Sequence, residues 1–399
     1  MVIREAYLER IRPFIDKELV KVLVGARRSG KTVLLAQIKD YLMSTGVSEK
    51  NFISINFESM KFGDIKTAER LYEYVQANVG EAKTKFYIFL DEIQEVENWQ
   101  LAVNSFPVDF NCDIYITGSN SKLLSGELST YLARRYVQIK VFPFTFWEAR
   151  QIAKQNKNYV SDEQTFRDYL KYGGFPGRFQ LQDDHSITTY LFDIYEAVLI
   201  RNIINRHNIK DIAVLRNVLN FLLDNIGNPF SARKITGKLL AHGIKIANST
   251  LLNYIEYFKE AFIILNAGRY DIKGKELLST TEKYYAVDLG IRNVVKKSED
   301  IDISKLFENA VYLEMMSRGY EVLVGKLDDK EIDFICYRGQ EKLYIQVAYL
   351  INDSDREREF GNLEQIHDNY PKYVVSADQI DLSRNGIIHK NIMQFLLEK

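Results

Sequence analysis

Cysteine, net charge and long apolar runs are scarce in this chain, and each scarcity excludes a class of protein. Only two cysteines, Cys112 and Cys336, occur among 399 residues, and they form no C-x-x-C pair, so neither a disulfide framework nor a zinc site is expected. The net charge of −1 provides no overall field toward nucleic acid or a membrane. No uncharged apolar run reaches the length of a membrane span, and the charged start MVIREAYLERI is unlike a signal peptide. We therefore predict a protein of the reducing cytoplasm with no membrane partner.

Proline is also scarce, with 6 residues against 25 tyrosines and 23 phenylalanines. This composition favours packed helices and strands over long linkers. The length is enough for about two to three domains.

The strongest pattern in the sequence is KVLVGARRSGKTVLL, residues 21–35. An apolar strand precedes a glycine-containing loop, and the apolar start of a helix follows it, so G-x-x-x-x-G-K-T stands in the context of a phosphate-binding loop. Loop N–H groups and the positive end of the helix dipole favour phosphate oxygens. Lys31 adds a full charge, and Thr32 offers a hydroxyl to Mg²⁺. The predicted ligand is ATP or ADP, bound by Gly25, Arg28, Ser29, Gly30, Lys31, Thr32 and Val33.

A second pattern pairs with this loop. Phe86–Leu90 (FYIFL) is a short apolar run of the kind buried in a parallel sheet, and Asp91 and Glu92 follow it directly. A buried strand that ends in two acids, downstream of a phosphate loop, is typical of a nucleotide hydrolase. Asp91 would hold Mg²⁺ opposite Thr32, and Glu92 would orient and deprotonate the attacking water.

Polar residues follow a third predicted strand, Asp113–Thr117 (DIYIT). Ser119 or Asn120 would lie where ligands bind in open α/β folds and could contact the γ-phosphate or the water, or they form a plain turn. A helix-like segment then ends in Arg134 and Arg135. An arginine there could neutralise transition-state charge in its own site or in a neighbour's, and the alternative is a solvated charge.

Together, VGARRSGKT, FLDEIQEVENW, ITGSNSKLLSGEL, YLARRYV and YGGFP resemble prokaryotic AAA+ ATPases (AAA_14-like) with a C-terminal domain of the DUF4143 type. The resemblance extends over nearly the whole chain. It implies that Ser119 and Asn120 act as sensor 1, and that Arg135 matches the arginine of an L-x-G-R-Y motif. Because Arg134 replaces the usual glycine, both arginines remain candidates. The resemblance also places Pro176 in a helical lid near the adenine.

Other elements are predicted from hydrophobic periodicity. Helices are expected at residues 4–15, 33–44, 64–79, 146–156, 161–172 and 184–202, and strands at 52–57 and 139–144. The mixed-charge segment Arg201–Asp211 is the predicted hinge after the lid.

Residues 212–290 predict a winged helix, because helices at 212–226, 231–241 and 249–262 precede a hairpin of 262–265 with 283–287. Leu252 is predicted to be buried, and Tyr254 and Tyr257 to face outward. Residues 231–250 hold four basic side chains and no acid, so the segment is interpreted as a DNA-reading face or as a protein–protein spacer. The residues that would contact DNA are Arg233, Lys234, Lys238, Lys245, Ser249, Thr250 and Asn253.

Residues 303–399 predict an α-β-β-β-α-β module that resembles the restriction-endonuclease-like fold, whose site is E…D…(E/Q)-x-K. Glu308, Asp333 and Gln346 occupy the first three positions, and Ala348 stands in place of the lysine. Such a site needs acidic oxygens for metal ions and a lysine beside the water. We therefore predict a degenerate domain that binds a partner.

The predicted fold is α/β: a P-loop AAA+ core (1–145), a helical lid (146–210), a winged helix (211–300) and a degenerate restriction-endonuclease-like domain (301–399). The predicted function is Mg²⁺-dependent binding and hydrolysis of ATP by a nucleotide-gated switch that binds double-stranded DNA. The alternatives are a switch that engages a protein through its C-terminal domain, and an ATP-controlled nuclease. A homo-oligomer follows if the arginine serves a neighbouring site.

Overall fold

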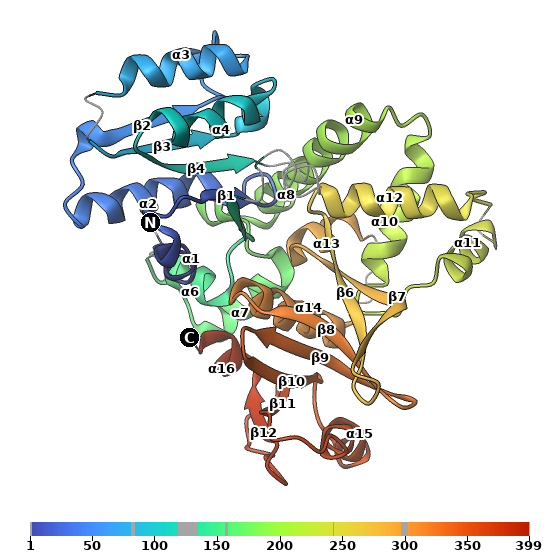
Figure 1. Cartoon of the computed structure of the whole chain (residues 1–399). Coiled ribbons are helices and arrows are strands. Elements are labelled where there is room, and N and C mark those ends of the chain that lie inside the picture. Colours follow the sequence, from blue (N-terminus) through green and yellow to red (C-terminus); the bar gives the residue numbers. More distant parts are fainter. Residues whose placement is uncertain are drawn as a thin grey trace. The chain divides into compact units, whose positions relative to one another are not determined.

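The computed structural model describes residues 2–80, 84–118, 132, 135–155, 159–241, 243–296 and 302–398. The chain forms two compact units, Met1–Phe142 and Pro143–Lys399 (Figure 1). Each unit contains its own sheet.

The first unit is built on a five-stranded parallel sheet. Its strands are β1 Val20–Val24, β2 Phe52–Asn56, β3 Phe86–Asp91, β4 Cys112–Gly118 and β5 Tyr136–Lys140, in the spatial order β2-β3-β4-β1-β5. The predicted strands at 52–57, 86–90 and 113–117 are confirmed. The strand predicted at 139–144 begins and ends earlier, and Pro143 has no N–H to give to a strand ladder.

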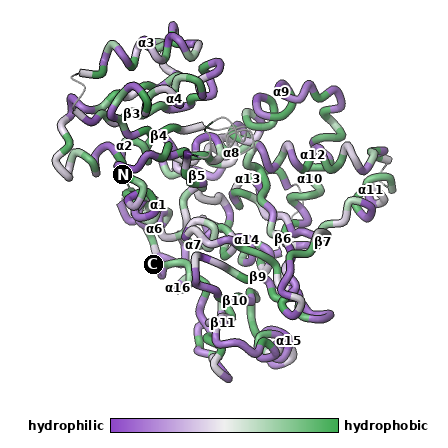
Figure 2. The backbone as a smooth tube through the Cα atoms, viewed as in Figure 1, coloured by the Kyte–Doolittle hydropathy of each residue, from purple (hydrophilic) through white to green (hydrophobic). Residues whose placement is uncertain are grey.

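Helices pack on this sheet. They are α1 Glu5–Ile11, α2 Lys31–Ser44, α3 Ala68–Asn78 and α4 Trp99–Asp109, with 3₁₀ turns η1 Arg12–Phe14, η2 Glu49–Asn51, η3 Met60–Phe62 and η4 Ile93–Glu95. Buried side chains of α1, α2 and the strands, among them Ile11, Ile38 and Phe89, form one hydrophobic cluster. Strand β3 is buried along its whole length, and its apolar residues are green in Figure 2. Continuous burial of this kind is expected where helices cover a parallel sheet.

The second unit begins with helices. They are α6 Phe146–Gln155, α7 Asp162–Tyr172, η6 Pro176–Gln180, α8 Asp184–Val198, the π-helix η7 Leu199–Ile204 and α9 Asn205–His207. The helices predicted at 146–156 and 161–172 are confirmed, and the Ser161 hydroxyl caps α7 by accepting the Gln164 N–H. The helical backbone continues to His207, through much of the segment that was predicted as a hinge.

Three further helices and a hairpin follow in the predicted order. They are α10 Ile212–Asp224, α11 Ala232–Ala241, α12 Asn248–Glu260, β6 Ile264–Asp271 and β7 Glu276–Ala286. Ile264 pairs with Ala286, so the predicted hairpin pairing is confirmed. Two predictions on α12 are wrong, because Leu252 is 47% exposed and Tyr254 is 7% exposed. Residue 254 belongs with Leu251, Ile255 and Phe258 on the i, i+3, i+4, i+7 stripe that faces the core.

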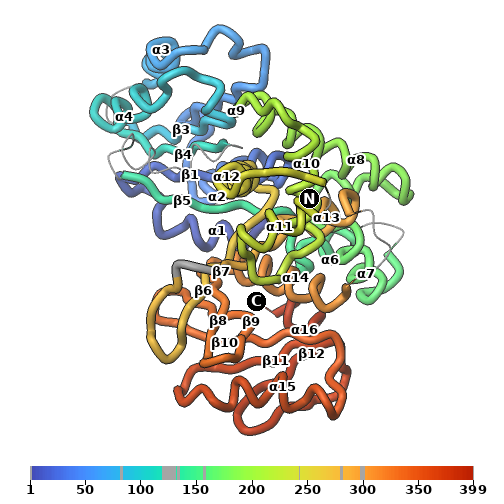
Figure 3. The backbone as a smooth tube through the Cα atoms, turned by 90° about the vertical axis from the view of Figure 1, so that its right-hand side faces the viewer, coloured from blue at the N-terminus to red at the C-terminus, as the bar shows by residue number. Residues whose placement is uncertain are grey.

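The hairpin is part of a larger mixed sheet. Five further strands of the described residues are β8 Glu321–Leu327, β9 Lys330–Arg338, β10 Glu341–Val347, β11 Lys372–Ser376 and β12 Ile388–Asn391. The described strands form the order β12-β11-β10-β9-β8-β6-β7, and β6 runs parallel to β8. The sheet therefore crosses the predicted boundary at residue 300. Helix α15 Asp353–Glu364 packs against β9, β10 and β11 (Figure 3). The remaining elements are α13 Leu289–Val295, α14 Ile303–Ser317 and α16 Ile392–Leu397.

A buried aspartate connects the turn at Gly173 and Gly174 to the start of α13. The Asp288 carboxylate accepts the Gly174 N–H at 2.6 Å and caps α13 through the Ile291 N–H at 3.1 Å. Gly173 has a φ of 68°, and a Cβ there would lie 2.1 Å from an Asp288 oxygen. Only glycine fits this close approach in a left-handed conformation.

The burial of Asp288 makes stability depend on pH. Burial raises its pKa from 3.8 to about 6, so the fold favours the neutral acid, and its stabilising contribution is complete below pH 3.8 and lost as pH rises through 6. We expect the unfolding free energy of the wild type, relative to Asp288→Asn, to fall by about 3 kcal/mol between pH 3.5 and pH 7. Urea titrations at each pH measure this difference.

Asp183→Asn is the matched control for this prediction. Hydrogen bonds from the Ser186 side chain and from its N–H lower the pKa of the exposed Asp183 carboxylate, so its contribution is lost as pH falls. The stability difference for Asp183→Asn should therefore change with pH in the opposite direction. Equal pH slopes for both variants would contradict the burial argument.

Candidate active site

The loop between β1 and α2 has the backbone that its glycines predict. A Cβ on Gly25 would lie 2.0 Å from the Val141 carbonyl oxygen, so no larger residue fits there. Gly30 adopts the left-handed φ of 96° directly before α2. At the helix start Thr32 and Val33 are exposed, whereas Ser29 in the loop is buried. The first N–H groups of α2 have no partner inside the helix, which makes this end fit for phosphate oxygens.

Lys31 is the first residue of α2, and its side chain is only 3% exposed. The ammonium donates to the carbonyl oxygens of Gly25 and Ala26 at 3.0 Å each. Its nitrogen also lies 3.8 Å from a Glu92 carboxylate oxygen. Burial lowers the Lys31 pKa, and the carboxylates of Glu92 and Asp91 oppose that shift. The structure therefore brings the predicted lysine and both predicted acids together.

Asp91 is the centre of a hydrogen-bond network at the carboxyl edge of the sheet. The Thr32 hydroxyl donates to Oδ2 at 2.8 Å, the Asn56 amide donates to Oδ2 at 3.0 Å, and the Thr117 hydroxyl donates to Oδ1 at 2.5 Å. Burial raises the Asp91 pKa, and the Thr117 and Thr32 hydrogen bonds oppose that rise. Thr32 and Asp91 thus present a hydroxyl and a carboxylate oxygen at one point, which are the hard donors that Mg²⁺ prefers.

The backbone of Glu92 is held in an unusual conformation. Its φ is 56°, in the left-handed region, and its N–H donates to the Thr117 hydroxyl at 2.9 Å. The Gln94 amide donates to its Oε2 at 2.6 Å. Backbone conformations of this kind persist where neighbouring contacts enforce them, and they cluster at functional sites.

Sequence reasoning missed three residues that support this site, two around Asp91 and one at the loop. Thr117 and Asn56 are the polar residues near the carboxyl ends of β4 and β2, and that position is the signal that could have identified them. Arg4 is 1% exposed, and its guanidinium donates to the carbonyls of Ser29 at 3.0 Å and Phe142 at 2.9 Å. No local pattern predicts this contact, because it joins segments 25 and 138 residues apart.

Three predicted site residues, Ser119, Asn120 and Arg134, lie outside the described residues. Arg135 is described and exposed. Its carbonyl accepts the Val20 N–H, and the next residue pairs with Val20 at the start of β1. The phosphate loop follows the other end of β1. Arg135 therefore lies at the edge of the sheet opposite to the loop of its own chain.

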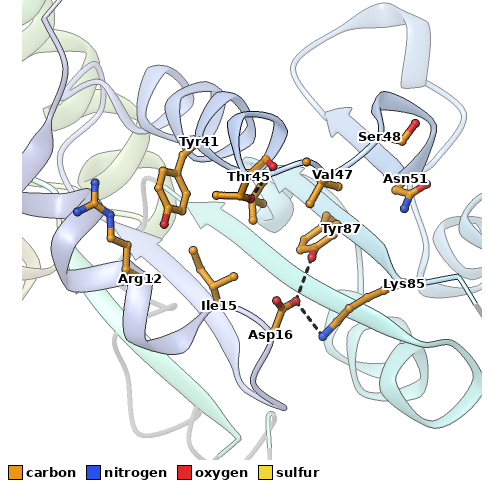
Figure 4. Close-up of a pocket in the computed structure, with 12 residues that line it drawn as sticks. Arg12, Ile15, Asp16, Tyr41, Thr45, Val47, Ser48, Asn51, Lys85 and Tyr87 are labelled. Atoms are coloured by element: carbon orange, nitrogen blue, oxygen red, sulfur yellow. Dashed lines mark hydrogen bonds and ion pairs between the residues drawn. The ribbon is translucent and has the colours of Figure 1, made fainter.

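A pocket of about 680 Å³ also lies at that opposite edge, next to the end of α2 (Figure 4). There Asp16 is held between the Lys85 ammonium at 2.9 Å and the Tyr87 hydroxyl at 3.0 Å. Because the phosphate loop is at the start of α2, this pocket is separate from the phosphate site.

The other predicted positions lie in the second unit. Pro176 opens the 3₁₀ helix η6 and is half-buried. The side chains predicted to contact DNA are on α11, on α12 and in the turn between them. All are exposed except Thr250, which is half-buried: Arg233, Lys234, Lys238, Lys245, Ser249 and Asn253.

The predicted nuclease-like residues meet around a lysine that the sequence did not indicate. Lys283 of β7 is 3% exposed, and its nitrogen lies 2.8 Å from Glu331, 3.0 Å from Glu308 and 3.9 Å from Asp333. The Gln346 side chain accepts the Asp333 N–H at 3.3 Å. No group of three or more His, Cys, Asp or Glu side chains in the described part of the chain is arranged to hold a metal ion. The Lys283 ammonium thus lies between these carboxylates and offsets their negative charge.

Comparison with known proteins shows the family. Residues 17–150 match the family model described as AAA domain, and residues 163–302 match a domain of unknown function, DUF8612. An uncharacterized protein of Haemophilus influenzae is 38% identical over 399 residues, which is 100% of this chain and 99% of that protein. Uncharacterized protein MJ1544 of Methanocaldococcus jannaschii is 31% identical over 357 residues, 87% of this chain and 78% of that protein. The chain belongs to this family of AAA-domain proteins.

The expected DUF4143-type domain is not what the family models find, since DUF8612 matches instead. Among solved structures, the ORC2 protein of Aeropyrum pernix (ADPNP-ADP complexes) has a TM-score of 0.40 at 10% identity and covers 78% of this chain and 93% of its own. The ORC1 protein of Aeropyrum pernix in complex with DNA has a TM-score of 0.29 at 15% identity, with 74% and 92% covered. No helix among the described residues is both long and apolar enough to cross a membrane.

Proposed function

We propose that this AAA-domain protein binds and hydrolyses ATP in a Mg²⁺-dependent manner and acts as a nucleotide-gated switch. The observation that carries the proposal is the contact of the Thr32 hydroxyl with the Asp91 carboxylate, 2.8 Å, beside the buried Lys31. A phosphate-binding helix terminus, two oxygen ligands for a cation and a neighbouring carboxylate, Glu92, are the parts that phosphoryl transfer to water requires.

The proposed roles combine the contacts of the described residues with the sequence resemblance, which alone supplies those of Asn120 and Pro176. The loop N–H groups and Lys31 bind the β- and γ-phosphates. Thr32 and Asp91 would hold Mg²⁺, which supplies positive charge to the phosphate oxygens. Glu92 would accept the proton of the attacking water, and the sequence resemblance assigns Asn120 to the γ-phosphate. The resemblance assigns Pro176, in the predicted helical lid, to the adenine, and hydrolysis would then change the position of the lid.

Arg135 is proposed to stabilise the transition state in a neighbouring copy. Its position at the sheet edge opposite to its own loop favours action in trans, and action in trans implies a homo-oligomer. We expect Arg135→Ala to lower the hydrolysis rate by about 10³-fold. A mixture of inactive Arg135→Ala and inactive Lys31→Ala chains should regain activity, because the second supplies the arginine to the first.

The mixing experiment has two clear readings. Phosphate release is measured as the ratio of the two variants changes and as total protein concentration rises. If the mixture stays inactive and the specific activity of the wild type is independent of concentration, action in trans is excluded. Arg134→Ala, assayed in parallel, shows which of the two arginines stabilises the transition state.

DNA binding through α11 and α12 is the second part of the proposal. The support is the set of exposed basic side chains on these elements, among them Arg233, Lys234 and Lys245. Fluorescence anisotropy with labelled double-stranded DNA, in the ATP-analogue and ADP states, tests it. Lys234→Glu should weaken binding and flatten its salt dependence, whereas Lys50→Glu, an exposed lysine of the first unit, should not. Absence of salt-sensitive binding in every nucleotide state would exclude this part.

The alternative is a switch that engages a protein partner through the C-terminal module. The net charge of −1 and the alanine at position 348 favour it over a nuclease. Pull-downs in both nucleotide states distinguish a protein partner from DNA. Recovery of nucleic acid alone would count against a protein partner. An ATP-controlled nuclease requires metal-dependent cleavage that Asp333→Ala abolishes.

A further inference from the structure

The helices of the second unit border a pocket that the proposed activity does not use. Its volume is about 1010 Å³, and α6, α7, η6 and α8 provide residues to its lining. Ile152, Leu181 and Ile187 contribute apolar surface. Arg178, two residues after Pro176, also lines the pocket.

Arg178 is a buried cation with unmet hydrogen-bond donors. Its side chain is 5% exposed, its Nε donates to the Gly173 carbonyl at 2.7 Å, and its Cζ lies 4.0 Å from the centre of the Phe179 ring. Its Nη2 has no hydrogen-bond partner among the residues that the structure describes. Burial lowers the Arg178 pKa to about 10, so the guanidinium remains protonated at neutral pH.

No carboxylate of the described residues forms an ion pair with this guanidinium. Asp288 and Asp168 attract it from a distance, but each has other partners. Asp288 accepts the Gly174 N–H, and Asp168 accepts the Gln164 amide. The charge of Arg178 is therefore balanced only from a distance.

Arg150, an arginine of α6, shows how the charge of a guanidinium is usually balanced. Arg150 binds Asp162 with two hydrogen bonds of 2.7 Å each. Buried polar groups in folded proteins have partners with few exceptions, and each exception needs an explanation. A planar guanidinium with free donors matches the oxygens of a carboxylate or phosphate.

We propose that this pocket binds a small organic anion, whose carboxylate or phosphate oxygens pair with Arg178 and whose apolar part packs on Ile152, Leu181 and Ile187. Side-chain amides of Gln155 and Gln180 line the same pocket and offer donors and acceptors to the other polar atoms of the ligand. The lining combines apolar and polar side chains, and it includes the carboxylates of Asp168 and Asp184. Asp168 accepts the Gln164 amide, and Asp184 accepts the Lys171 ammonium and the Tyr172 hydroxyl. A concave site of this volume with convergent polar groups is suited to a small molecule.

Calorimetric titration of the full chain tests this site. The protein is first saturated with ADP, so that the phosphate loop does not compete for the probes. The probes are inorganic phosphate, glycerol 3-phosphate and butyrate, which separate free phosphate, a phosphate ester and a carboxylate. At least one should bind the wild type, and Arg178→Gln should weaken that binding at least tenfold. Arg167→Gln removes the same charge from an exposed position on α7 and should leave the affinity unchanged.

A second variant keeps the test valid if Arg178→Gln fails to fold. Ala153→Phe places a ring in the pocket and leaves the arginine intact, so it should abolish binding of the same probe. The proposal is overturned if no probe binds the wild type at millimolar concentration. It is equally overturned if Arg178→Gln or Ala153→Phe, when folded, binds the probe as tightly as the wild type does.

Discussion

Glu92→Gln is expected to lower the rate of ATP hydrolysis at least about 100-fold while leaving ATP affinity within about twofold of the wild type. The carboxylate is the proposed proton acceptor for the attacking water, and a positioned general base contributes about 10²–10⁴-fold. The amide keeps the size of the side chain and an acceptor oxygen for the Gln94 amide, which now donates at 2.6 Å. Lys31 and the loop N–H groups, which bind the phosphates, are unchanged. Phosphate release measures hydrolysis, and calorimetry with ATP measures binding.

Glu95→Gln is the matched control for this experiment. Glu95 is an exposed acid in the adjacent 3₁₀ turn η4, so its replacement should leave both hydrolysis and binding unchanged. Assays with and without DNA show in addition whether nucleic acid controls the turnover. Hydrolysis by Glu92→Gln at the wild-type rate would refute the assigned role.

Lys283→Met is expected to destabilise the protein by about 3–5 kcal/mol at neutral pH. Methionine preserves the length of the side chain but removes the charge that lies 2.8 Å from Glu331 and 3.0 Å from Glu308. Three carboxylates would then face one another in a largely buried place, and breaking a buried ion pair from one side costs about this much. Urea titration of the full chain, followed by circular dichroism, measures the change.

The pH dependence of this loss identifies its cause. Burial already raises the pKa of Asp333, and the neighbouring Glu308 raises it further, while Lys283 lowers it. Without the ammonium the Asp333 carboxylate should take up its proton at higher pH, so the destabilisation should shrink as pH falls. Lys326→Met is the control, because Lys326 is 3.7 Å from Asp271 at a half-exposed position and its loss should cost less than about 1 kcal/mol. Equal losses for the two variants would contradict the argument.

The best sequence predictions concern groups that are close along the chain. The phosphate loop is contiguous, and the Asp91–Glu92 pair directly follows an apolar strand, so spacing and periodicity were enough to locate them. The hairpin of β6 and β7 was predicted with the correct partners, since Ile264 faces Ala286. Its continuation into the larger sheet was not, because the parallel pairing of Arg269 with Val324 joins segments that share no local signal.

Helix phase explains the errors on α12. Leu252 and Tyr254 are both large and partly apolar, so composition alone does not tell which of them faces the core. The stripe is fixed by the neighbours that the helix packs against, and these place Tyr254 inside and Leu252 outside. Side-chain polarity is a weak guide for tyrosine, which has an apolar ring and a polar end.

By itself the sequence determined the strand–loop–helix junction of the predicted phosphate loop and the acidic pair at the end of β3, because backbone geometry at such a junction depends on residues next to one another. The tertiary structure decided which side chains complete each site. Thr117 and Asn56 reach Asp91, Arg4 reaches Ser29, and Lys283 reaches Glu308. These contacts join segments that are far apart in the chain, and only the packing of strands and helices makes them neighbours.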